Sequence, residues 1–158
     1  MLTLTMTMLA IMLNTAAPMT TSDHGKMHII RYEGFSSAPY RDAHGCSVGY
    51  GHWLHSGPCA ASDRHVTKAE AWEMFEKDIS LRENLLRKLV KVPLLQNEFD
   101  AMLGFMYNVG AGALRRSTLL KKLNAGDKRG AADEFLRWSK NPGIIKRRIA
   151  TRKMFLNE

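Results

Sequence analysis

A chain of 158 residues is long enough for one domain with a sizeable core and too short for several domains. Apolar residues make up 45% and charged residues 24%, so the composition excludes a disordered protein. The formal net charge is +8, and the excess lies in residues 115–158, which hold thirteen basic and four acidic side chains. Such a field attracts polyanions, among them nucleic acid, an anionic membrane or an acidic cell-wall polymer.

The N-terminal segment differs from the rest of the chain. Residues 1–22 contain no charged side chain and are rich in Met, Thr and Leu. They lack the basic start of a signal peptide, and they are barely long and apolar enough for a membrane-spanning helix. We therefore separate residues 1–19, as a signal peptide, a weak signal-anchor or a packed extension, from a domain over residues 20–158.

The first part of this domain changes from helix to strand along the chain. Its predicted elements are a helix over residues 23–33, short strands over 39–54 with a turn at 42–45, and a loop over 55–65. The helix can begin at a polar cap, turn Met27 and Ile30 toward the interior and end at Gly34. The turn is predicted because Asp, His and Gly favour tight turns between strands.

The second part is predicted to be helical. TKAE at residues 67–70 forms a capping box, because its hydroxyl and carboxylate can each accept a hydrogen bond from a free backbone N–H. It opens a long helix to about Val90, and Pro93 separates this helix from the next. That next helix has a core-facing stripe of Phe99, Met102, Leu103 and Met106. Gly110 and Gly112 should break it. Further helices are predicted from Ser117 to Asn124, through Phe135 and Trp138, and from Ile144 to Phe155.

These elements describe an α+β domain with two lobes. One helix leads into a small lobe rich in strands, and a long helix connects that lobe to a second, helical lobe. A cleft between two such lobes is where a chain-like substrate would lie. The residues that could act on a substrate should therefore come from the end of the first helix and from the strand-rich segment that follows it.

The segment EGFSSAPYRDAHGCSVGYGH, residues 33–52, carries two carboxylates and a hydroxyl. A glycosidase needs one carboxyl that protonates the leaving oxygen and a second group that activates water or attacks. Glu33 ends an amphipathic helix beside two aromatic residues, where loss of water favours a protonated carboxyl, whereas Asp42 lies in a polar turn. Ser47 could hold the attacking water. On spacing alone, two ordinary surface carboxylates are the simpler interpretation.

The surrounding residues resemble a known family. EGF…PYRDAHGCSVGYGH is similar to the phage-type lysozymes, the endolysins of glycoside hydrolase family 24, in which a helix ending in E-G precedes a Y-x-D turn, a Thr and G-Y-G-H. The resemblance covers nearly all of residues 20–156 and includes FDAMLGFMYNVGAGALRRSTLLKKLNAGD and NPGIIKRRIATRKMF. It implies a lysozyme-like, mostly helical fold with a small β-hairpin lobe and a long interlobe helix.

The resemblance also implies the reaction and the roles in it. The reaction would be hydrolysis of the β-1,4 bond between N-acetylmuramic acid and N-acetylglucosamine in peptidoglycan, with no metal or cofactor. Glu33 takes the position of the family's general acid, and Asp42 that of its Asp. Ser47 takes the position of the family Thr when GYGH is the anchor, although counting from Asp42 points to Val48, which has no hydroxyl. Inversion at the anomeric carbon would place the two carboxyls roughly 6.5–9.5 Å apart.

Substrate contacts and partners are implied in the same way. The residues expected along the cleft are Tyr50, His52, Asn108, Arg147 and Arg148. The basic C-terminal lobe would bind an anionic cell wall or membrane surface, and the enzyme would be a monomer. It would act in the host periplasm or cell wall at lysis, after export or release from the membrane. A phage or prophage origin follows from the family.

Two alternatives compete with this interpretation. Cys46 and Cys59 could form one disulfide or remain two reduced thiols. With His52 and His55 they form the pattern C-x5-H-x2-H-x3-C, which offers four zinc ligands but lacks the usual short paired spacings.

The basic residues 115–158, interleaved with aromatic residues, could instead bind nucleic acid, but the helical spacing of those aromatic residues is typical of a core. We therefore expect neither a metal nor a nucleic-acid partner.

Overall fold

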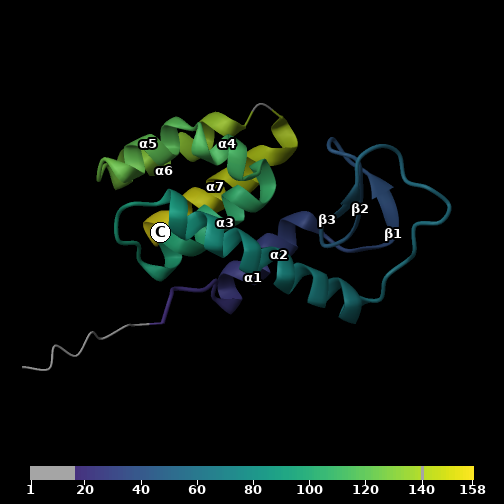
Figure 1. Cartoon of the computed structure of the whole chain (residues 1–158). Helices are drawn as coiled ribbons and strands as arrows, with labels where there is room; N and C mark the ends of the chain where they lie inside the picture. The colour runs from purple at the N-terminus through teal and green to yellow at the C-terminus, as the bar shows by residue number, and fades with distance from the viewer. Residues whose placement is uncertain (1–16, 140) are drawn as a thin grey trace, which may run out of the picture.

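The computed structural model describes residues 17–139 and 141–158 (Figure 1). This part of the chain is α+β, with seven α-helices, a short 3-10 helix and one three-stranded antiparallel sheet in the order β1-β2-β3. The first elements are α1 (Asp23–Glu33), β1 (Ser36–Arg41), β2 (Cys46–Gly49), β3 (His52–His55) and α2 (Lys68–Leu89). The others are α3 (Gln96–Val109), α4 (Ala111–Arg115), α5 (Thr118–Asn124), α6 (Lys128–Glu134), η1 (Phe135–Trp138) and α7 (Pro142–Leu156).

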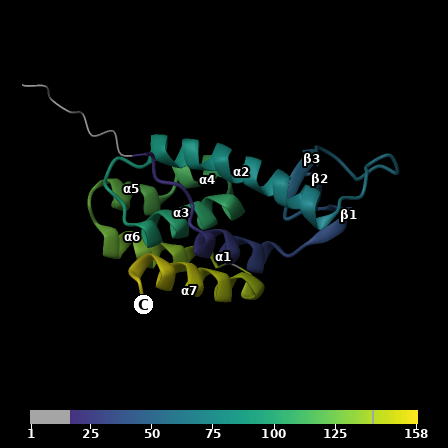
Figure 2. The same cartoon turned by 90° about the horizontal axis from the view of Figure 1, so that it is seen from below.

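The sheet and the helical bundle form separate lobes that α2 connects. Figures 1 and 2 show the three strands at one end of the molecule and α3 to α7 at the other, with α2 extending from the strands into the bundle. The small lobe has its own core of Val48, Val66 and Ala71, in which α2 packs on the sheet. The predicted two-lobed architecture is confirmed, and its two lobes leave an open face between them.

The main core is built around α3. This helix contacts α1, α2 and α7, and its residues from Glu98 to Tyr107 are all buried. A helix that is buried on every side needs apolar residues all round, and the run AMLGFM supplies them. The predicted stripe on this helix is confirmed, because Phe99, Met102, Leu103 and Met106 all lie in the core.

Helix ends follow the caps that the sequence predicts. The Ser22 hydroxyl accepts a hydrogen bond from the backbone N–H of Gly25 at the start of α1. Thr67 and Glu70 form the reciprocal capping box of α2, and Ser117 caps α5. Each such cap stabilises its helix by about 1 kcal/mol and fixes where it begins. At the other end of α1, Gly34 has φ +71°, which a glycine adopts without strain.

Some details of the prediction are wrong. Met27 is 57% exposed, whereas Ile30 packs against the core as predicted and Ile29 is fully buried. Gly25 packs so closely on Asp100 that it sets the inward face of α1, and this face then falls on positions 25 and 29. Strand β1 begins at residue 36, before the predicted start, and α4 continues the chain through the predicted break at Gly112.

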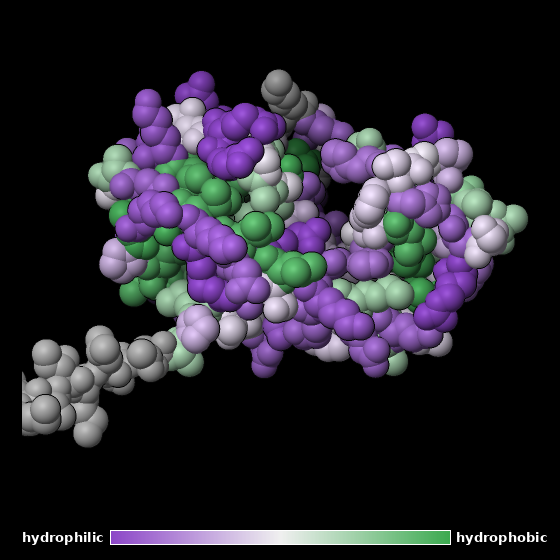
Figure 3. Space-filling model, in the orientation of Figure 1, coloured by the Kyte–Doolittle hydropathy of each residue, from purple (hydrophilic) through white to green (hydrophobic). Residues whose placement is uncertain are grey.

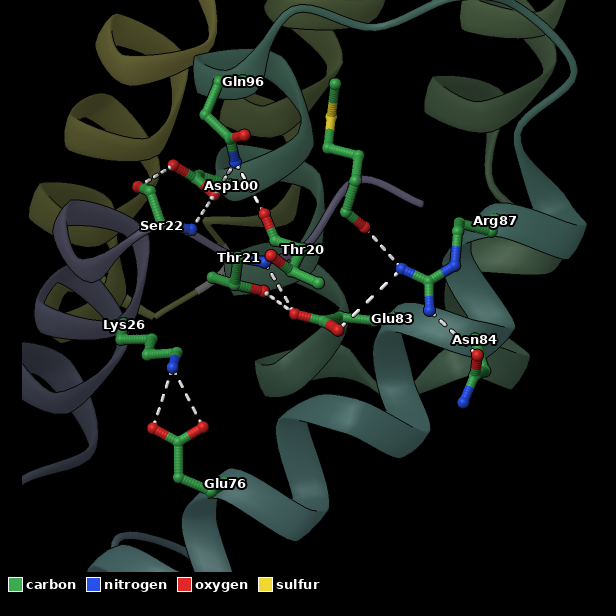
Figure 4. A network of polar contacts seen from close by, with 11 residues as sticks. Thr20, Thr21, Ser22, Lys26, Glu76, Glu83, Asn84, Arg87, Gln96 and Asp100 are labelled. Atoms are coloured by element: carbon green, nitrogen blue, oxygen red, sulfur yellow. Dashed lines mark hydrogen bonds and ion pairs between the residues drawn. The ribbon is translucent and has the colours of Figure 1, made fainter. Parts of the chain in front are cut away.

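The segment that leads into α1 is fixed by polar contacts (Figure 4). Its hydrogen bonds join Met19 to Arg87, Thr20 to Gln96, Thr21 to Glu83 and Ser22 to Asp100. These partners come from α2 and α3, so residues 19–22 pack against the helical bundle. Most of the predicted N-terminal segment, residues 1–16, lies outside the described residues. Within residues 17–139 and 141–158, no helix is long and apolar enough to cross a bilayer.

Candidate active site

A cleft of about 710 Å³ lies between the two lobes. Figure 3 shows the molecular surface hollowed between the sheet and the helical bundle. The lining comes from the end of α1, the sheet and its turns, α2 and the end of α3, and consists of Glu33, Tyr40, Asp42, Ala43, His44, Ser47, Gly51, Trp53, Arg82, Tyr107, Asn108, Val109 and Gly110. All three predicted catalytic residues therefore face one cavity.

Glu33 is held by an arginine from the far end of the chain. Its Oε1 accepts a hydrogen bond from Nη2 of Arg147 at 2.7 Å, and this guanidinium also lies 5.6 Å from the ring centroid of Tyr32. Oε2 has no hydrogen-bond partner in the described part of the chain. It lies beside Gly51, where an added Cβ would come within 3.4 Å of it and where φ is +85°. Gly51 thus leaves the free oxygen of Glu33 open to the cleft.

Asp42 is held by its own turn. Its Oδ1 accepts hydrogen bonds from the backbone N–H groups of His44 and Gly45, at 2.7 and 3.0 Å. Its Oδ2 accepts a 2.5 Å hydrogen bond from the hydroxyl of Ser47. The Ser47 hydroxyl, followed by the two backbone N–H groups, lowers the pKa of Asp42. Asp42 is therefore a carboxylate at neutral pH.

Tyrosines surround the two carboxylates. Tyr40 lines the cleft, and burial together with the charges of Glu33 and Asp42 raises the pKa of its hydroxyl. Tyr107 lies on the floor of the cleft and donates a 2.9 Å hydrogen bond to the carbonyl of Tyr50. Burial raises the pKa of Tyr107 well above its usual range, so both hydroxyls stay protonated. They are neutral hydrogen-bonding groups in a site whose charge comes from other residues.

Asn108 is oriented by a buried arginine. Nη2 of Arg148 donates a 2.6 Å hydrogen bond to Oδ1 of Asn108, and its Nε donates to the carbonyl of Trp138 at 3.3 Å. Arg148 is 1% exposed and lies over the ring of Phe105, and burial lowers its pKa to about 10. Because the Asn108 oxygen is engaged in this way, the amide NH2 group remains for a ligand in the cleft.

Known proteins resemble this chain over most of its length. Residues 30–152 match the family model described as phage lysozyme. The chain belongs to the phage lysozyme family. It is 39% identical over 149 residues to an endolysin of Acyrthosiphon pisum secondary endosymbiont phage 1, a match that covers 87% of this chain and 98% of that relative. It is 35% identical over 122 residues to a SAR-endolysin of Enterobacteria phage PA-2, covering 77% and 72%. The solved structure of a P22 lysozyme mutant has a TM-score of 0.72 at 34% identity, over 87% of this chain and 99% of that one.

Membership in this family makes the chain a peptidoglycan-degrading lysozyme, a glycoside hydrolase. Its substrate is the glycan of bacterial peptidoglycan, a long chain that needs an open groove. The cleft between the lobes has that form, and exposed Trp53 at its edge offers an apolar ring face of the kind on which a sugar can pack.

Ser47 brings a hydroxyl to the cleft. Two positions compete for it in the sequence, because the segment after Asp42 is one residue shorter than in the family pattern. The Ser47 hydroxyl contacts Asp42, whereas Val48 is fully buried in the small core. Pairing of Ser47 with Trp53 and of Val48 with His52 across β2 and β3 fixes this register.

The expected cleft residues divide into two groups. Asn108 lines the cleft, but Arg147 and Arg148 are buried behind it and act on Glu33 and Asn108. Tyr50 packs between Phe35 and Phe75, with ring centroids 5.4 and 5.9 Å away. His52 forms a 3.0 Å pair with Asp78 that joins β3 to α2. These four residues support the site from outside its lining.

The cysteines form the predicted disulfide. The Sγ atoms of Cys46 and Cys59 are 2.02 Å apart, and their Cα atoms are 5.0 Å apart. This bond uses both thiolates that a zinc site would need, while His52 and His55 pair with carboxylates. The zinc alternative is therefore wrong. The disulfide instead ties the loop after β3 to the strand that carries Ser47.

Sequence reasoning missed several lining residues. They are Tyr40, His44, Trp53, Arg82 and Tyr107. Tyr40 belongs to the Y-x-D turn and Tyr107 directly precedes Asn108, so proximity to predicted site residues could have indicated both. No comparable signal marks Arg82, which lies in the middle of a long helix.

Proposed function

We propose that this lysozyme cleaves the glycan with Glu33 as general acid, and with Asp42 and Ser47 placing the attacking water. The observation that supports this most is the meeting of two differently held carboxylates in one cleft. A division of tasks between two carboxyls is what hydrolysis of a glycosidic bond requires. The bond cleaved is the β-1,4 bond between N-acetylmuramic acid and N-acetylglucosamine.

Glu33 would supply the proton. A proton on its Oε2 passes to the glycosidic oxygen while the bond between that oxygen and the anomeric carbon breaks. Arg147 holds Oε1 at 2.7 Å, which keeps Oε2 directed at the substrate. After the transfer Glu33 is a carboxylate, and the adjacent guanidinium stabilises this new charge.

Asp42 and Ser47 would act on the other reactant. The Asp42 carboxylate stabilises positive charge at the anomeric carbon and accepts a proton as water bonds to that carbon. Ser47 donates its hydrogen to Asp42, so its oxygen lone pairs remain to accept a hydrogen bond from this water. Attack from the face opposite the leaving group inverts the anomeric carbon, and such enzymes have carboxyls roughly 6.5–9.5 Å apart.

The variant Glu33→Gln tests the proposal. It keeps the size of the side chain and removes the proton donor, so the rate should fall by a factor on the order of 10²–10⁴. The measurement is release of reducing ends from purified peptidoglycan, with thermal unfolding as the check on folding. Glu76→Gln is the control, because it changes a carboxyl of a surface pair with Lys26 outside the cleft. Full activity in a folded Glu33→Gln protein would disprove the assigned role.

The basic helical lobe fits an anionic surface in the cell envelope. Its exposed cations with no acidic partner in the described residues include Arg115, Arg116, Lys121, Lys146 and Lys153. We propose that this lobe holds a monomeric enzyme on the cell wall or membrane of the host, in the periplasm. The relative named SAR-endolysin supports this location. Steep loss of wall binding, but not of catalysis on soluble glycan, with added salt would test it.

The nucleic-acid alternative has no support. Phe155 is buried, and Trp138 stacks edge-on against Phe105 with centroids 5.4 Å apart. The buried ring of Phe155 cannot stack on bases, which binding of single-stranded nucleic acid requires, and the ring of Trp138 is half-buried against the core. The family match indicates a wall-degrading enzyme instead.

A further inference from the structure

We propose that Arg82 binds a carboxylate of the peptide attached to the muramic acid, and so makes the enzyme prefer peptide-bearing glycan. This inference rests on the proposed function, since it concerns the same cleft. Among the lining residues in the described part of the chain, Arg82 is the one Lys or Arg side chain. The lining also includes the carboxylate of Asp42, which repels an anionic substrate, so a cation is needed where an anionic group of the substrate binds.

Arg82 is fixed before any ligand binds. Its Nη1 donates a 3.1 Å hydrogen bond to the carbonyl of Asp78 and lies 3.6 Å from Oδ1 of that residue. Its guanidinium lies over the ring of Tyr107, 4.3 Å from the centroid. Because the side chain is held from two directions, binding a ligand would cost little side-chain entropy. This arrangement is that of a preorganised cation at the floor of the cleft.

The Arg82 side chain also has hydrogen-bond donors that no residue in the described part of the chain uses. An arginine carries five N–H donors, and only Nη1 of Arg82 donates to protein in the described residues. Asp78 satisfies the charge only in part, because its Oδ2 is engaged by His52 at 3.0 Å. The side chain is 28% exposed, so a ligand can reach the unused edge. That planar edge matches a carboxylate with two parallel hydrogen bonds.

The neighbouring arginines cannot take this role. Arg147 and Arg148 are buried, one paired with Glu33 and the other hydrogen-bonded to Asn108. The glycan backbone itself carries amides and hydroxyls, and the free carboxylates of peptidoglycan lie on the peptides joined to the lactyl group of muramic acid. A cation facing the sugar cleft therefore fits an acidic peptide better than it fits the sugars.

The experiment compares two substrates that differ only in the peptide. Glycan strands are used with their peptides and after removal of the peptides by an amidase. Because that hydrolysis leaves a free lactyl carboxylate on each muramic acid, this group is then converted to its neutral methylamide, and kcat/KM is measured on each substrate. Arg82→Met should lose roughly 10- to 100-fold on peptide-bearing strands, mainly through KM, and stay within about twofold of wild type on bare strands. Arg82→Lys keeps the charge without the planar fork and should fall between the two. Lys77→Met, which removes an exposed cation of the same helix outside the cleft, is the matched control.

The outcomes separate this inference from the proposed mechanism. Equal losses on both substrates, or no loss on either, would overturn the role of Arg82. Dissociation constants of inactive Glu33→Gln protein for peptide-bearing and bare glycan fragments give a second readout, and adding Arg82→Met should weaken only the former. If Glu33→Gln itself were fully active, the mechanism would fail while the peptide preference could still be measured in wild type. Arg82→Gln replaces Arg82→Met if the methionine variant does not fold.

Discussion

The two acidic side chains of the cleft, Asp42 and Glu33, differ in how far along the sequence their hydrogen-bond partners lie. Asp42 is fixed by hydrogen bonds from residues two to five positions later, within one turn of the hairpin lobe. Glu33 is fixed by Arg147, 114 positions away in α7. One half of the site therefore forms wherever the hairpin forms, whereas the other half exists only when the C-terminal helix packs on α3. Damage to the helical lobe should reach Glu33 and leave Asp42 in place.

The variant Arg147→Met breaks the long-range half of the site. It removes the partner of Glu33, and activity should fall roughly 100-fold because the acid loses its orientation. Loss of a charge-assisted hydrogen bond should also lower the free energy of unfolding by about 2 kcal/mol. Steady-state kinetics on peptidoglycan and urea unfolding measure the two effects.

The matched control is Arg152→Met in the same helix. Arg152 pairs at the surface with Asp133 and Glu158, so its loss should cost less than about 1 kcal/mol and leave kcat unchanged. If both variants lost the same activity, the dependence would lie on α7 in general and not on the pair of Arg147 with Glu33. An unchanged kcat in Arg147→Met would contradict the positioning role.

Acid should weaken the helical side of the site through His28. This residue of α1 makes a 3.1 Å hydrogen bond to Thr151 of α7, and burial, followed by the charge of Arg147, lowers its pKa to about 4. In the unfolded chain the pKa is about 6.5. As pH falls through that value the unfolded state takes up the proton first, so stability present above about pH 6.5 is lost between pH 6.5 and pH 4. Because the side chain is only half-buried and solvent screens part of the effect, we expect a loss of about 1–2 kcal/mol.

Unfolding by urea across this pH range measures the effect. In His28→Gln the free energy of unfolding should change less between pH 6.5 and pH 4 than it does in wild type, because this residue no longer takes up a proton. His44→Gln, a change at an exposed histidine in the hairpin turn, is the control and should keep the wild-type slope. Equal slopes in wild type and His28→Gln would rule out this half-buried histidine as the source.

The same contrast explains what the sequence could predict. The limits of α1 and the capping box of α2 depend on residues a few positions apart, and both were predicted. The hydrogen bond from Ser47 to Asp42 is equally local, and the sequence predicted that both residues belong to the site but not that they contact each other. The pairing of Glu33 with Arg147 and the stacking of Arg82 on Tyr107 depend on which helices pack together. Sequence spacing carries no direct record of that packing. A resemblance to the family could identify the region of Arg147 but not its partner.

The smallest expected effect tests the local half of the site. Ser47→Ala removes the hydroxyl that lowers the pKa of Asp42 most, so the pKa of Asp42 should rise. The acid limb of the pH–activity profile should therefore move to higher pH, and activity near the optimum should fall roughly tenfold because the water is misplaced.

Ser37→Ala, which removes a hairpin hydroxyl bonded to the carbonyl of Val66, is the control and should change neither the acid limb nor the activity at the optimum. Ser47→Thr should restore the wild-type acid limb, because it returns the hydroxyl. A shifted acid limb in Ser47→Ala that Ser47→Thr returns to the wild-type position would show that the hydroxyl acts through Asp42. An unchanged pH profile in Ser47→Ala would contradict this and show that the backbone N–H groups of the turn hold the carboxylate without it.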